Sequence, residues 1–333
     1  MDEKTAPADI GAETLPLAAV ELPTPASDRL GYVFAAAGAI LFSTNAVAIK
    51  IAYRDSVDAT TVLALRMVLS SPFYLAIGWH SLRDRRRTGR GLPSFNLTLA
   101  AAGCGLLGYW VASYLDFLGL EYVTAQIERL ILFTYPIFIV IFGALFFAQK
   151  ISRNAAVAVA VSYLGLAVIF GQNATAGGRN GLIGGALVLA AAVSFAFYQL
   201  FARSVIGAMG PRLFTCISML SAAVAAIAQF LVTRPVSDLG VSGRVWLSAL
   251  FIAVGSTVLP TFFISAALHR ISAQANATIG TLSPVATILL AYLILGETLS
   301  PLAWLGTALV IAGVGWFTLA EAARSPRRET GAR

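Results

Sequence analysis

Four charged residues stand inside long apolar runs, where their side chains would be surrounded by lipid: Lys50, Arg66, Glu128 and Arg129. A charge at the centre of a membrane span costs about 2.5–3.5 kcal/mol, so such residues are rare and are commonly paired or functional. Depths counted from the ends of the predicted spans place all four in the same third of the bilayer. Three positive charges and one negative charge could attract a carboxylate. The pattern predicts an anion-binding or gating cluster; the alternative is a structural Glu–Arg pair with a lysine that reaches the membrane surface.

Neutral polar and aromatic side chains at membrane depth extend this site. Trp110 has an apolar body and a polar tip, which suits an amphipathic solute, although it could also belong to an interfacial aromatic belt. Tyr198 and Gln199 could equally hydrogen-bond between helices. Neighbouring residues lie about 100° apart on a helix, so at most one of Glu128 and Arg129 should face a cavity directly. The predicted substrate-binding residues are Asn45, Trp110, Glu128, Arg129, Tyr135, Tyr198, Gln199, Asn276 and Ser283.

Two prolines at membrane depth, Pro136 and Pro284, occupy matching places in the two halves of the chain. Each removes a backbone hydrogen bond and loosens its helix. Irregular helices near the bilayer midplane commonly mark the binding site of a carrier. We therefore predict gating or structural roles for both prolines, together with Lys50 and Arg66.

No residue pattern points to a cofactor or a metal ion. Cys104 and Cys216 each lie in an apolar run, without metal-ligand spacing or a disulfide framework. The chain has no Walker motif, so ATP is not expected to drive it directly. His80 and His269 fall at span ends on the side opposite to the acidic residues of the first half. This separation disfavours an enzyme that acts on a lipid within the membrane.

The composition indicates a membrane protein. The chain is 58% hydrophobic and only 12% charged, whereas soluble domains carry about 25% charged residues. The net charge of +7 does not indicate nucleic acid as a partner, because the basic residues are distributed over short loops between apolar runs. Lipid is therefore expected to contact most of the chain.

Ten apolar runs are long enough to cross a bilayer, which needs about 20 residues per helix. Open strands could not satisfy their backbone groups in lipid, so we predict an all-α fold with ten transmembrane helices. The predicted spans are Gly31–Ala52, Thr60–Trp79, Asn96–Leu115, Thr124–Phe147, Asn154–Gly171, Gly181–Ala202, Leu213–Val232, Val245–Ala267, Gln274–Leu295 and Pro301–Ala320.

The basic residues predict the orientation of these spans. If the N-terminus is cytoplasmic, 16 of the 23 Lys and Arg residues lie in cytoplasmic segments, 4 lie outside and 3 lie within spans. Cytoplasmic loops carry an excess of Lys and Arg, so both termini are expected on the cytoplasmic side of the cell inner membrane. The polar ends, 1–28 and 321–333, are expected to be cytoplasmic tails, the first of them disordered.

The second half of the chain repeats the first. Shifting the numbering by 148 places Ala125-Gln126 on Ala273-Gln274 and Pro136 on Pro284; nearer the start of each half, a shift of 153 places Phe42 on Phe195. Five spans per half is an odd number, so the halves should cross the membrane in opposite directions, as in many carriers. We predict two inverted five-helix repeats, 29–173 and 180–320.

Several motifs resemble the drug/metabolite transporter superfamily, EamA type. The second half has Ser283-Pro284 and the turn Gly296-Glu297-Thr298-Leu299-Ser300, and the first span has Phe42-Ser43-Thr44-Asn45. Arg66 also falls where the second span of that family often carries Arg. The first half departs from the pattern, because Ala148-Gln149-Lys150-Ile151-Ser152 lacks the Glu. The resemblance implies a central cavity lined by the first, third and fourth spans of each half, with the fifth spans as scaffold.

The residues and the resemblance together predict a secondary transporter rather than an enzyme. The expected activity is export of a small organic metabolite, an amino acid or a related carboxylate, by alternating access. The alternatives are an intramembrane enzyme acting on a lipid and a multidrug or nucleotide-sugar type carrier. The expected partners are a small-molecule substrate and membrane lipid, and the chain could also form a homodimer.

Overall fold

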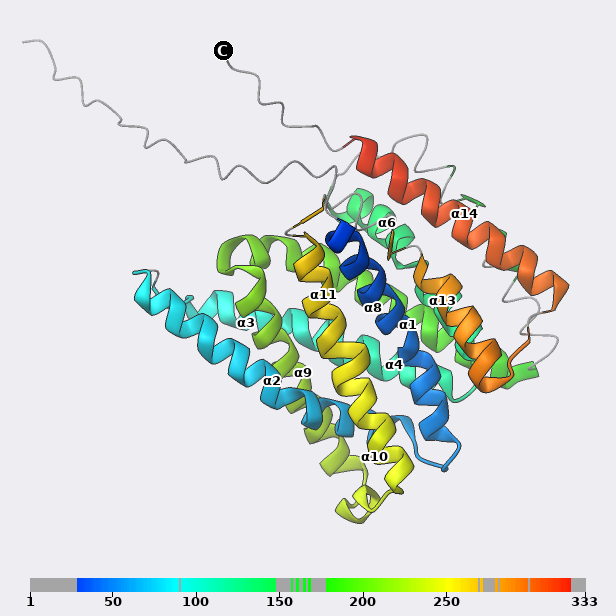
Figure 1. Ribbon diagram of the computed structural model, residues 1–333, viewed down its shortest axis with the longest axis horizontal. Coiled ribbons are helices and arrows are strands. Elements are labelled where there is room, and N and C mark those ends of the chain that lie inside the picture. The colour runs from blue at the N-terminus through cyan, green and yellow to red at the C-terminus, as the bar shows by residue number, and fades with distance from the viewer. Residues whose placement is uncertain are drawn as a thin grey trace, which may run out of the picture.

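The computed structural model describes residues 29–89, 91–147, 178–268, 270–271, 279–280, 282–298 and 300–324, with a few isolated positions between 157 and 168. Over these residues the chain is helical and contains no strand (Figure 1). The elements are α1 (Arg29–Tyr53), α2 (Ala59–Arg87), α3 (Phe95–Gly105), η1 (Leu106–Val111), α4 (Ala112–Leu120), α5 (Ala125–Leu132), α6 (Tyr135–Phe147), α8 (Gly178–Met209), α9 (Pro211–Thr233), η2 (Val236–Leu239), α10 (Gly243–Leu250), η3 (Phe251–Val258), α11 (Leu259–Leu268), α13 (Leu282–Leu290), η4 (Ala291–Leu295) and α14 (Pro301–Arg324).

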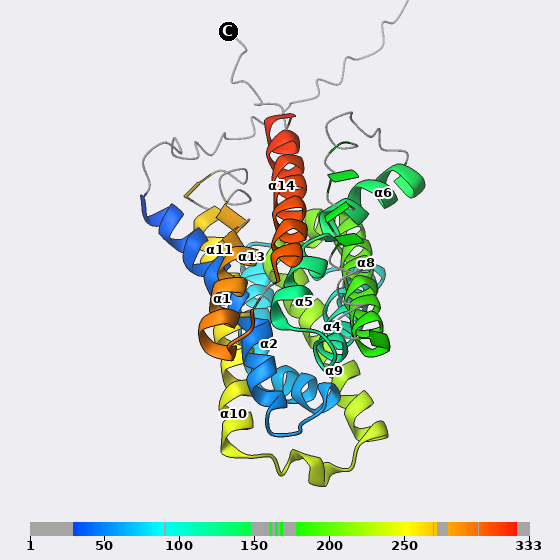
Figure 2. The same ribbon diagram turned by 90° about the vertical axis from the view of Figure 1, so that its right-hand side faces the viewer.

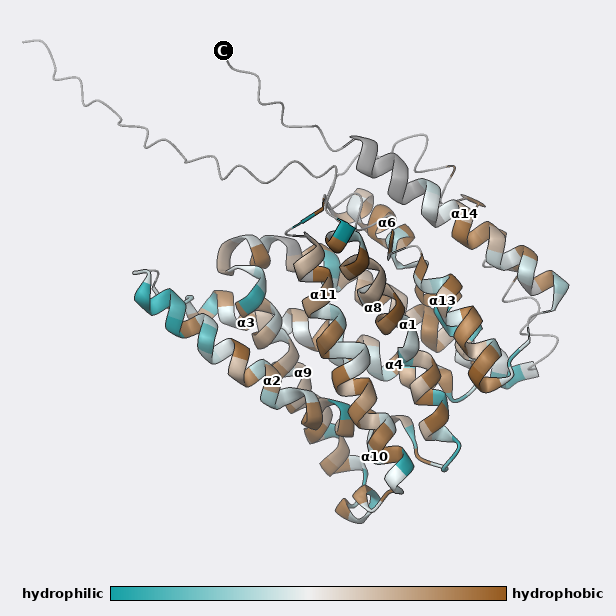
Figure 3. Cartoon of the chain, in the orientation of Figure 1, coloured by the Kyte–Doolittle hydropathy of each residue, from teal (hydrophilic) through white to brown (hydrophobic). Residues whose placement is uncertain are grey.

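These helices confirm an all-α, multi-span membrane fold. Within the described residues, seven helical stretches, three of them made of consecutive elements, are long and apolar enough to cross a bilayer: 29–53, 59–87, 95–120, 125–146, 178–202, 211–233 and 243–264. The predicted ninth and tenth spans correspond to the shorter apolar helices Leu282–Leu295 and Trp304–Gly313. Most of the predicted fifth span, 154–171, lies outside the described residues. Coloured by hydropathy, the helices are mostly brown or pale along their length, and strongly teal residues are prominent at the outer end of α2 and in loops (Figure 3).

Helix-capping side chains define where several spans begin. Asp58 accepts hydrogen bonds from the backbone of Thr60 and Thr61 at the start of α2. Ser94, Thr124 and Ser242 accept equivalent bonds at the starts of α3, α5 and α10. Each cap satisfies a backbone N–H that has no partner inside its helix, which matters most at the edge of a low-dielectric membrane.

The spans run alternately between two ends of the bundle. We name the end with the loops at 54–58, 121–124, 234–242 and 296–300 the acidic end. There Arg244 Nη1 lies 3.1 Å from Asp55 Oδ1 and joins the α1–α2 loop to the start of α10. The opposite, basic end holds the last turn of α2, where Arg85 Nη1 donates to the carbonyl oxygen of Met209 at 2.9 Å. Since Met209 ends α8, helix α8 runs from the acidic to the basic end, opposite to α1.

Several of the described spans lose regular α geometry along their length. Residues 133–134 separate α5 from α6, so the predicted span Thr124–Phe147 is two helices, with Pro136 in the first turn of the second. The third span contains the π-helical segment η1, and the eighth span contains η3. Adding 148 to the residue numbers of η1 gives a range that overlaps η3, so the two segments occupy equivalent places in the repeat. Such π-helical segments are frequent at functional sites. Pro284 likewise lies in the first turn of α13.

A dense apolar core fills the acidic end. It includes Ile49 of α1, Leu63 of α2 and Phe117 and Leu120 of α4, all 0–1% exposed. Helix α14, by contrast, lies at the edge of the bundle (Figure 1, Figure 2), with Trp304, Leu305 and Trp316 more than half exposed. These exposed apolar side chains face lipid when the chain is in a membrane.

Candidate functional site

A central cavity of about 350 Å³ lies between the two halves. This volume is within the range of about 300–1,000 Å³ that is usual for small-molecule sites. The cavity is lined from α1, α2, η1 and α4 to α6 of the first half, and from α8, α9, η3, α11 and α13 of the second. Among the described residues α14 contributes none of the lining, in keeping with the scaffold role expected for the fifth span.

The lining residues recur at the spacing of the sequence repeat. Many have a partner in the other half that also lines the cavity. At a spacing of 148 these pairs are Gly108/Ser256, Tyr109/Thr257, Ser113/Thr261, Asp116/Ile264, Leu132/Gly280 and Tyr135/Ser283, and at a spacing of 153 they are Phe42/Phe195 and Arg66/Met219.

The charged lining comes from the first half: Arg66, Asp116 and Arg129. They are 7%, 6% and 4% exposed. Arg66 is replaced by Met219 and Asp116 by Ile264 at the equivalent positions of the second half. The cavity therefore has one charged wall and one wall of neutral polar and apolar side chains in the part that the structure describes.

Arg66 is held against α4. Its Nη1 donates to Ser113 Oγ at 3.3 Å, and its guanidinium carbon lies 5.4 Å from the centre of the Phe117 ring. Its buried Nε has no hydrogen-bond partner among the described residues. The cation is thus fixed by a hydroxyl and a ring, and it retains a free donor for a ligand.

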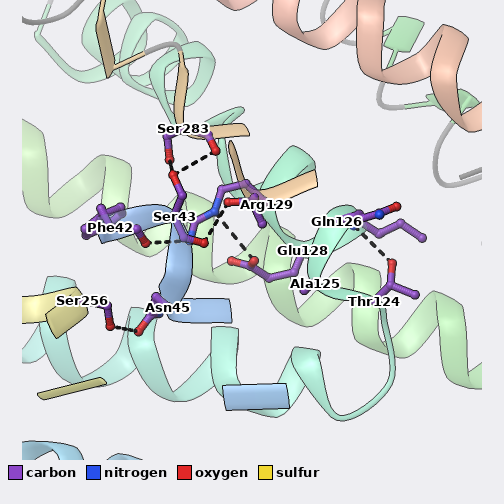
Figure 4. Close-up of polar contacts among 12 residues, drawn as sticks. Phe42, Ser43, Asn45, Thr124, Ala125, Gln126, Glu128, Arg129, Ser256 and Ser283 are labelled. Carbon is purple, nitrogen blue, oxygen red and sulfur yellow. Dashed lines mark hydrogen bonds and ion pairs between the residues drawn. The ribbon is translucent and has the colours of Figure 1, made fainter. Parts of the chain in front are cut away.

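Arg129 is held against α1. Its Nη2 donates to the carbonyl oxygen of Phe42 at 3.4 Å, and its guanidinium carbon lies 5.3 Å from the centre of the Phe42 ring (Figure 4). The Nε atom is 4.0 Å from Glu128 Oε2. Glu128 is fully buried and does not line the cavity, so it lies behind Arg129 as a counter-charge. Of the two adjacent residues, only Arg129 reaches the cavity, as the helix geometry requires.

Aromatic side chains form much of the remaining wall. Tyr135 and Phe195 meet edge to face with their ring centres 5.0 Å apart. The hydroxyl groups of Tyr109 and Tyr198 are 2.9 Å apart, with Tyr198 lying behind Tyr109. Gly108 permits this packing, because a Cβ at that position would lie 2.4 Å from Tyr198 Cγ.

Hydroxyl groups join α1 to the second half beside the cavity. Ser43 Oγ donates to Ser283, with Oγ–Oγ 2.9 Å and Oγ–O 3.0 Å, and Thr287 Oγ1 donates to the carbonyl oxygen of Ser43 at 3.0 Å. Ser256 Oγ donates to Asn45 Oδ1 at 3.1 Å (Figure 4). The polar motif of the first span is therefore used for contacts between the halves.

The structure divides the predicted site residues into two groups. Those that line the cavity are Asn45, Arg66, Arg129, Tyr135 and Ser283. Lys50, Trp110, Glu128, Pro136, Tyr198, Gln199 and Pro284 do not line it. Trp110 instead donates its indole N–H to Gln229 Oε1 at 2.7 Å, whereas Pro136 and Pro284 directly follow two lining residues. Asn276 lies outside the described residues.

Asp116 was not among the predicted site residues because the predicted third span ended one residue before it. The predicted span stops at Leu115, whereas α4 continues to Leu120 and buries the carboxylate. The helical spacing of Tyr109, Ser113 and Asp116, at i, i+4 and i+7, places the three on one face and could have indicated it. Tyr74 and Thr261 also line the cavity without having been predicted.

A hydrogen-bonded clasp closes the acidic end above the cavity. Glu297 accepts bonds from the backbone N–H groups of Ala125 at 3.1 Å and Gln126 at 3.3 Å, at the start of α5. The Gln126 amide donates in return to the carbonyl oxygens of Glu297 at 3.1 Å and Ile288 at 3.3 Å. We call Glu297 and Gln126 the acidic-end clasp; it joins the second half to the first.

The described residues contain no group of three His, Cys, Asp or Glu side chains that could hold a metal ion. The described lining of the cavity offers two guanidinium groups, one carboxylate, hydroxyl groups and aromatic rings.

Comparisons with known proteins assign this architecture to a family. The model of the EamA-like transporter family matches residues 29–171 and again residues 182–319. A solved crystal structure matches with a TM-score of 0.58 and 19% identity, over 87% of this chain and 98% of that one, which supports the fold alone.

Two curated relatives align over most of their length. An uncharacterized transporter of Bacillus subtilis, YcbK, is 28% identical over 280 residues, covering 81% of this chain and 86% of the relative. A probable terminal-alkyne amino-acid exporter of Streptantibioticus cattleyicolor is 29% identical over 261 residues, covering 76% and 82%.

Proposed function

Because the chain belongs to the EamA-like transporter family, we propose that it exports a small organic carboxylate, an amino acid or a close relative, by alternating access. Membership of a transporter family supports transport rather than catalysis. The observation that carries the choice of cargo is the pair of arginines, Arg66 and Arg129, buried on one wall of the cavity. Guanidinium groups bind carboxylates with charge-assisted hydrogen bonds, which are strong in a low-dielectric site. The relative named as a probable amino-acid exporter agrees with this cargo.

We assign the structure to an inward-facing state, with the basic end on the cytoplasmic side of the inner membrane. The acidic end is closed by the apolar core and by the acidic-end clasp. The cavity is lined by Ala35 of α1, Thr215 of α9 and Ile264 of α11. Each of these residues lies within about two helical turns of the end of its helix that is at the basic end of the bundle, so the cavity extends toward that end. Export would begin in this state, with cargo entering from the cytoplasm.

Transport then requires the clasp to open while the basic end closes. The breaks that could absorb this movement are the α5–α6 junction and the π-helical segments η1 and η3, all beside the cavity. Hinges in transporters are commonly a few residues at such interruptions. An inverted repeat would provide two related gates around one site.

The test is counterflow of radiolabelled amino acids into proteoliposomes that contain the purified protein. Arg66→Gln and Arg129→Gln should each lower uptake about tenfold or more, because each removes a charged donor worth roughly 1.5–3 kcal/mol. Arg244→Gln is the matched control, since Arg244 pairs with Asp55 at the acidic end and does not line the cavity. Parental uptake in both arginine variants would contradict the proposed site.

A further inference from the structure

Asp116 of α4 and Glu128 of α5 bring two buried carboxyl groups into hydrogen-bond contact with each other. Asp116 is 6% exposed and lines the cavity, whereas Glu128 is fully buried behind it and does not. In the described part of the chain, no N–H or hydroxyl group donates to Asp116 Oδ1 or to either carboxyl oxygen of Glu128. These oxygens therefore depend on the contact between the two acids.

A contact of this kind requires a proton. Two carboxylates that touch in a low-dielectric site repel each other, so they do not both ionise. One proton removes the repulsion, because the protonated acid then donates to the ionised one in a charge-assisted hydrogen bond. Arg129 Nε lies 4.0 Å from Glu128 Oε2, which favours the negative charge on Glu128 and the proton on Asp116. Such a pair gains and loses its proton as a unit.

Charged side chains from several segments act on this pair. They are Lys50 of α1, Arg66 of α2, Arg129 of α5 and Glu297 of the loop before α14. Tyrosine hydroxyls on the neighbouring elements have partners of their own: Tyr53 donates to the carbonyl oxygen of Phe117, and Tyr109 and Tyr198 bond each other. Helix α13, which packs against α5, contains no titratable residue. The lysine and the glutamate carry opposite charges, so the two cavity arginines supply the excess positive charge.

The proton determines the net charge that a ligand meets in the cavity. Arg66 and Arg129 are both cations on one wall, and the pair with its proton carries a single negative charge. A carboxylate bound to the arginines neutralises the positive charge that remains. If the pair lost its proton, the same carboxylate would add an uncompensated negative charge to a buried site. Proton and carboxylate therefore favour each other's binding, and this linkage is reciprocal.

The repeated framework does not need the two acids. At the spacing of 148, Asp116 corresponds to Ile264 and Glu128 to Asn276. Ile264 lines the same cavity, so an apolar side chain fits the place that Asp116 occupies in the repeat. The acid pair is thus a feature of one wall of the site rather than of the helical frame.

We propose that Asp116 and Glu128 form a proton-binding site linked to the cargo site, so that the pair holds one proton while a carboxylate is bound to Arg66 and Arg129. The proton is exchanged with the cavity through the Asp116 carboxyl group, and Glu128 keeps the negative charge. The proton site stands on the contact between the two acids, whereas its link to cargo rests on the proposed function.

The shared proton is tested without any ligand, by infrared spectroscopy of the purified full chain at neutral pH. A protonated carboxyl group has a carbonyl stretching band apart from the bands of carboxylates, and ordinary Asp and Glu side chains are ionised at this pH. Asp116→Asn and Glu128→Gln should each remove the band of one protonated carboxyl group, because the remaining acid ionises. Asp238→Asn, in the η2 loop, is the control and should keep the band. Absence of the band in the parent, or its retention in either variant, would overturn the shared proton.

The link to cargo is tested with 4-methylpentanoate, a monoanion at neutral and alkaline pH that has no titrating amino group. Its binding is followed over a series of pH values by the ligand-induced rise in the melting temperature of the full chain in detergent. Above the pH at which the pair loses its proton, the affinity of the parent should fall about tenfold per pH unit, because one proton is linked to one ligand.

Asp116→Asn keeps this position neutral at every pH, so its affinity should stay within about twofold of the low-pH parental value throughout the series. Asp238→Asn should follow the parent. A parental affinity that does not change with pH, or an Asp116→Asn variant that keeps the parental pH dependence, would overturn the link but leave carboxylate export standing. No binding by the parent at any pH would count against the proposed function and the link together, whereas the infrared band decides the shared proton in either case.

Discussion

The cavity uses its charged residues in two layers. Arg66, Asp116 and Arg129 face the interior, and Glu128 lies directly behind Arg129 with its carboxylate oxygens closed off from the cavity. The nearest approach between this pair is 4.0 Å, from Arg129 Nε to Glu128 Oε2. Because the two are adjacent in sequence, the counter-charge lies in the same turn of α5 as the cavity-lining arginine.

At the residue scale, Glu128→Gln should destabilise the protein in detergent by about 1–3 kcal/mol, because it leaves the buried Arg129 without its counter-charge. Glu128→Gln with Arg129→Gln should recover most of that loss without recovering counterflow. Thermal unfolding and counterflow measured on the same preparations check both expectations. Strictly additive losses of stability in the double variant would mean that the two side chains do not interact.

The elements around the cavity are irregular where the lining residues lie. Gly108 and Tyr109 belong to η1 and Ser256 and Thr257 to η3, so both π-helical segments contribute lining at equivalent repeat positions. A π-helical turn changes the direction of the side chains that follow it, and it leaves backbone groups less regularly bonded. These helices can therefore present polar groups to the cavity while their outer faces stay apolar.

At the element scale, Glu297→Gln should weaken the acidic-end clasp, since the charge-assisted bonds to Ala125 and Gln126 become neutral ones. If the state with a closed acidic end loses roughly 1.4 kcal/mol of stabilisation, the ratio of outward-facing to inward-facing protein rises about tenfold. We expect a change of about this size. The measurement is the rate at which a membrane-impermeant thiol reagent, added from the acidic side, labels Thr257→Cys in a background with Cys104→Ala and Cys216→Ala.

The control for this experiment is Asp238→Asn, which removes a carboxylate from the acidic end outside the clasp. An unchanged labelling rate in Glu297→Gln would show that the clasp does not hold the acidic end closed. Faster labelling from the basic side as well would indicate general loosening of the bundle rather than a shift between two states.

The whole molecule has opposite chain directions in its two halves. Helix α1 runs from the basic to the acidic end, and α8, its counterpart in the second half, runs the other way, as the contact between Arg85 and Met209 requires. The cavity receives equivalent positions from both halves, whereas its charges come from the first. The repeat thus provides a symmetric frame with an asymmetric site.

At the scale of the whole molecule, reporter fusions in the loops 88–94 and 234–242 should lie on opposite sides of the membrane, with the first loop cytoplasmic. The reason is the excess of basic residues at the basic end. Paired alkaline phosphatase and fluorescent-protein fusions report the side of each loop. Equal signals from the two loops would contradict the ten-span inverted arrangement.

Hydrophobicity and loop charge were sufficient to predict the membrane class and the helical fold. Lipid offers no partners for backbone groups, so a chain with such long apolar runs has few structures open to it. The α2 boundary at Asp58 and the turn at Gly296, with φ of +72°, also follow from local residue preferences. The matching places of Pro136 and Pro284 were visible in the repeat alone.

The identity of the residues that meet in the cavity was decided by tertiary structure. In helices that are apolar on nearly every side, periodicity does not tell which face turns inward, so Trp110 was expected in the site but bonds Gln229 instead. The extension of α4 to Leu120 brought Asp116 into the cavity, and the packing of the Glu297 turn on α5 joined residues far apart in the chain. Sequence alone thus determined that the chain crosses a membrane as paired helical halves, because solvation acts on each segment separately. Only the packed fold decided which charges share one cavity, because that depends on the rotation and depth of each helix against its neighbours.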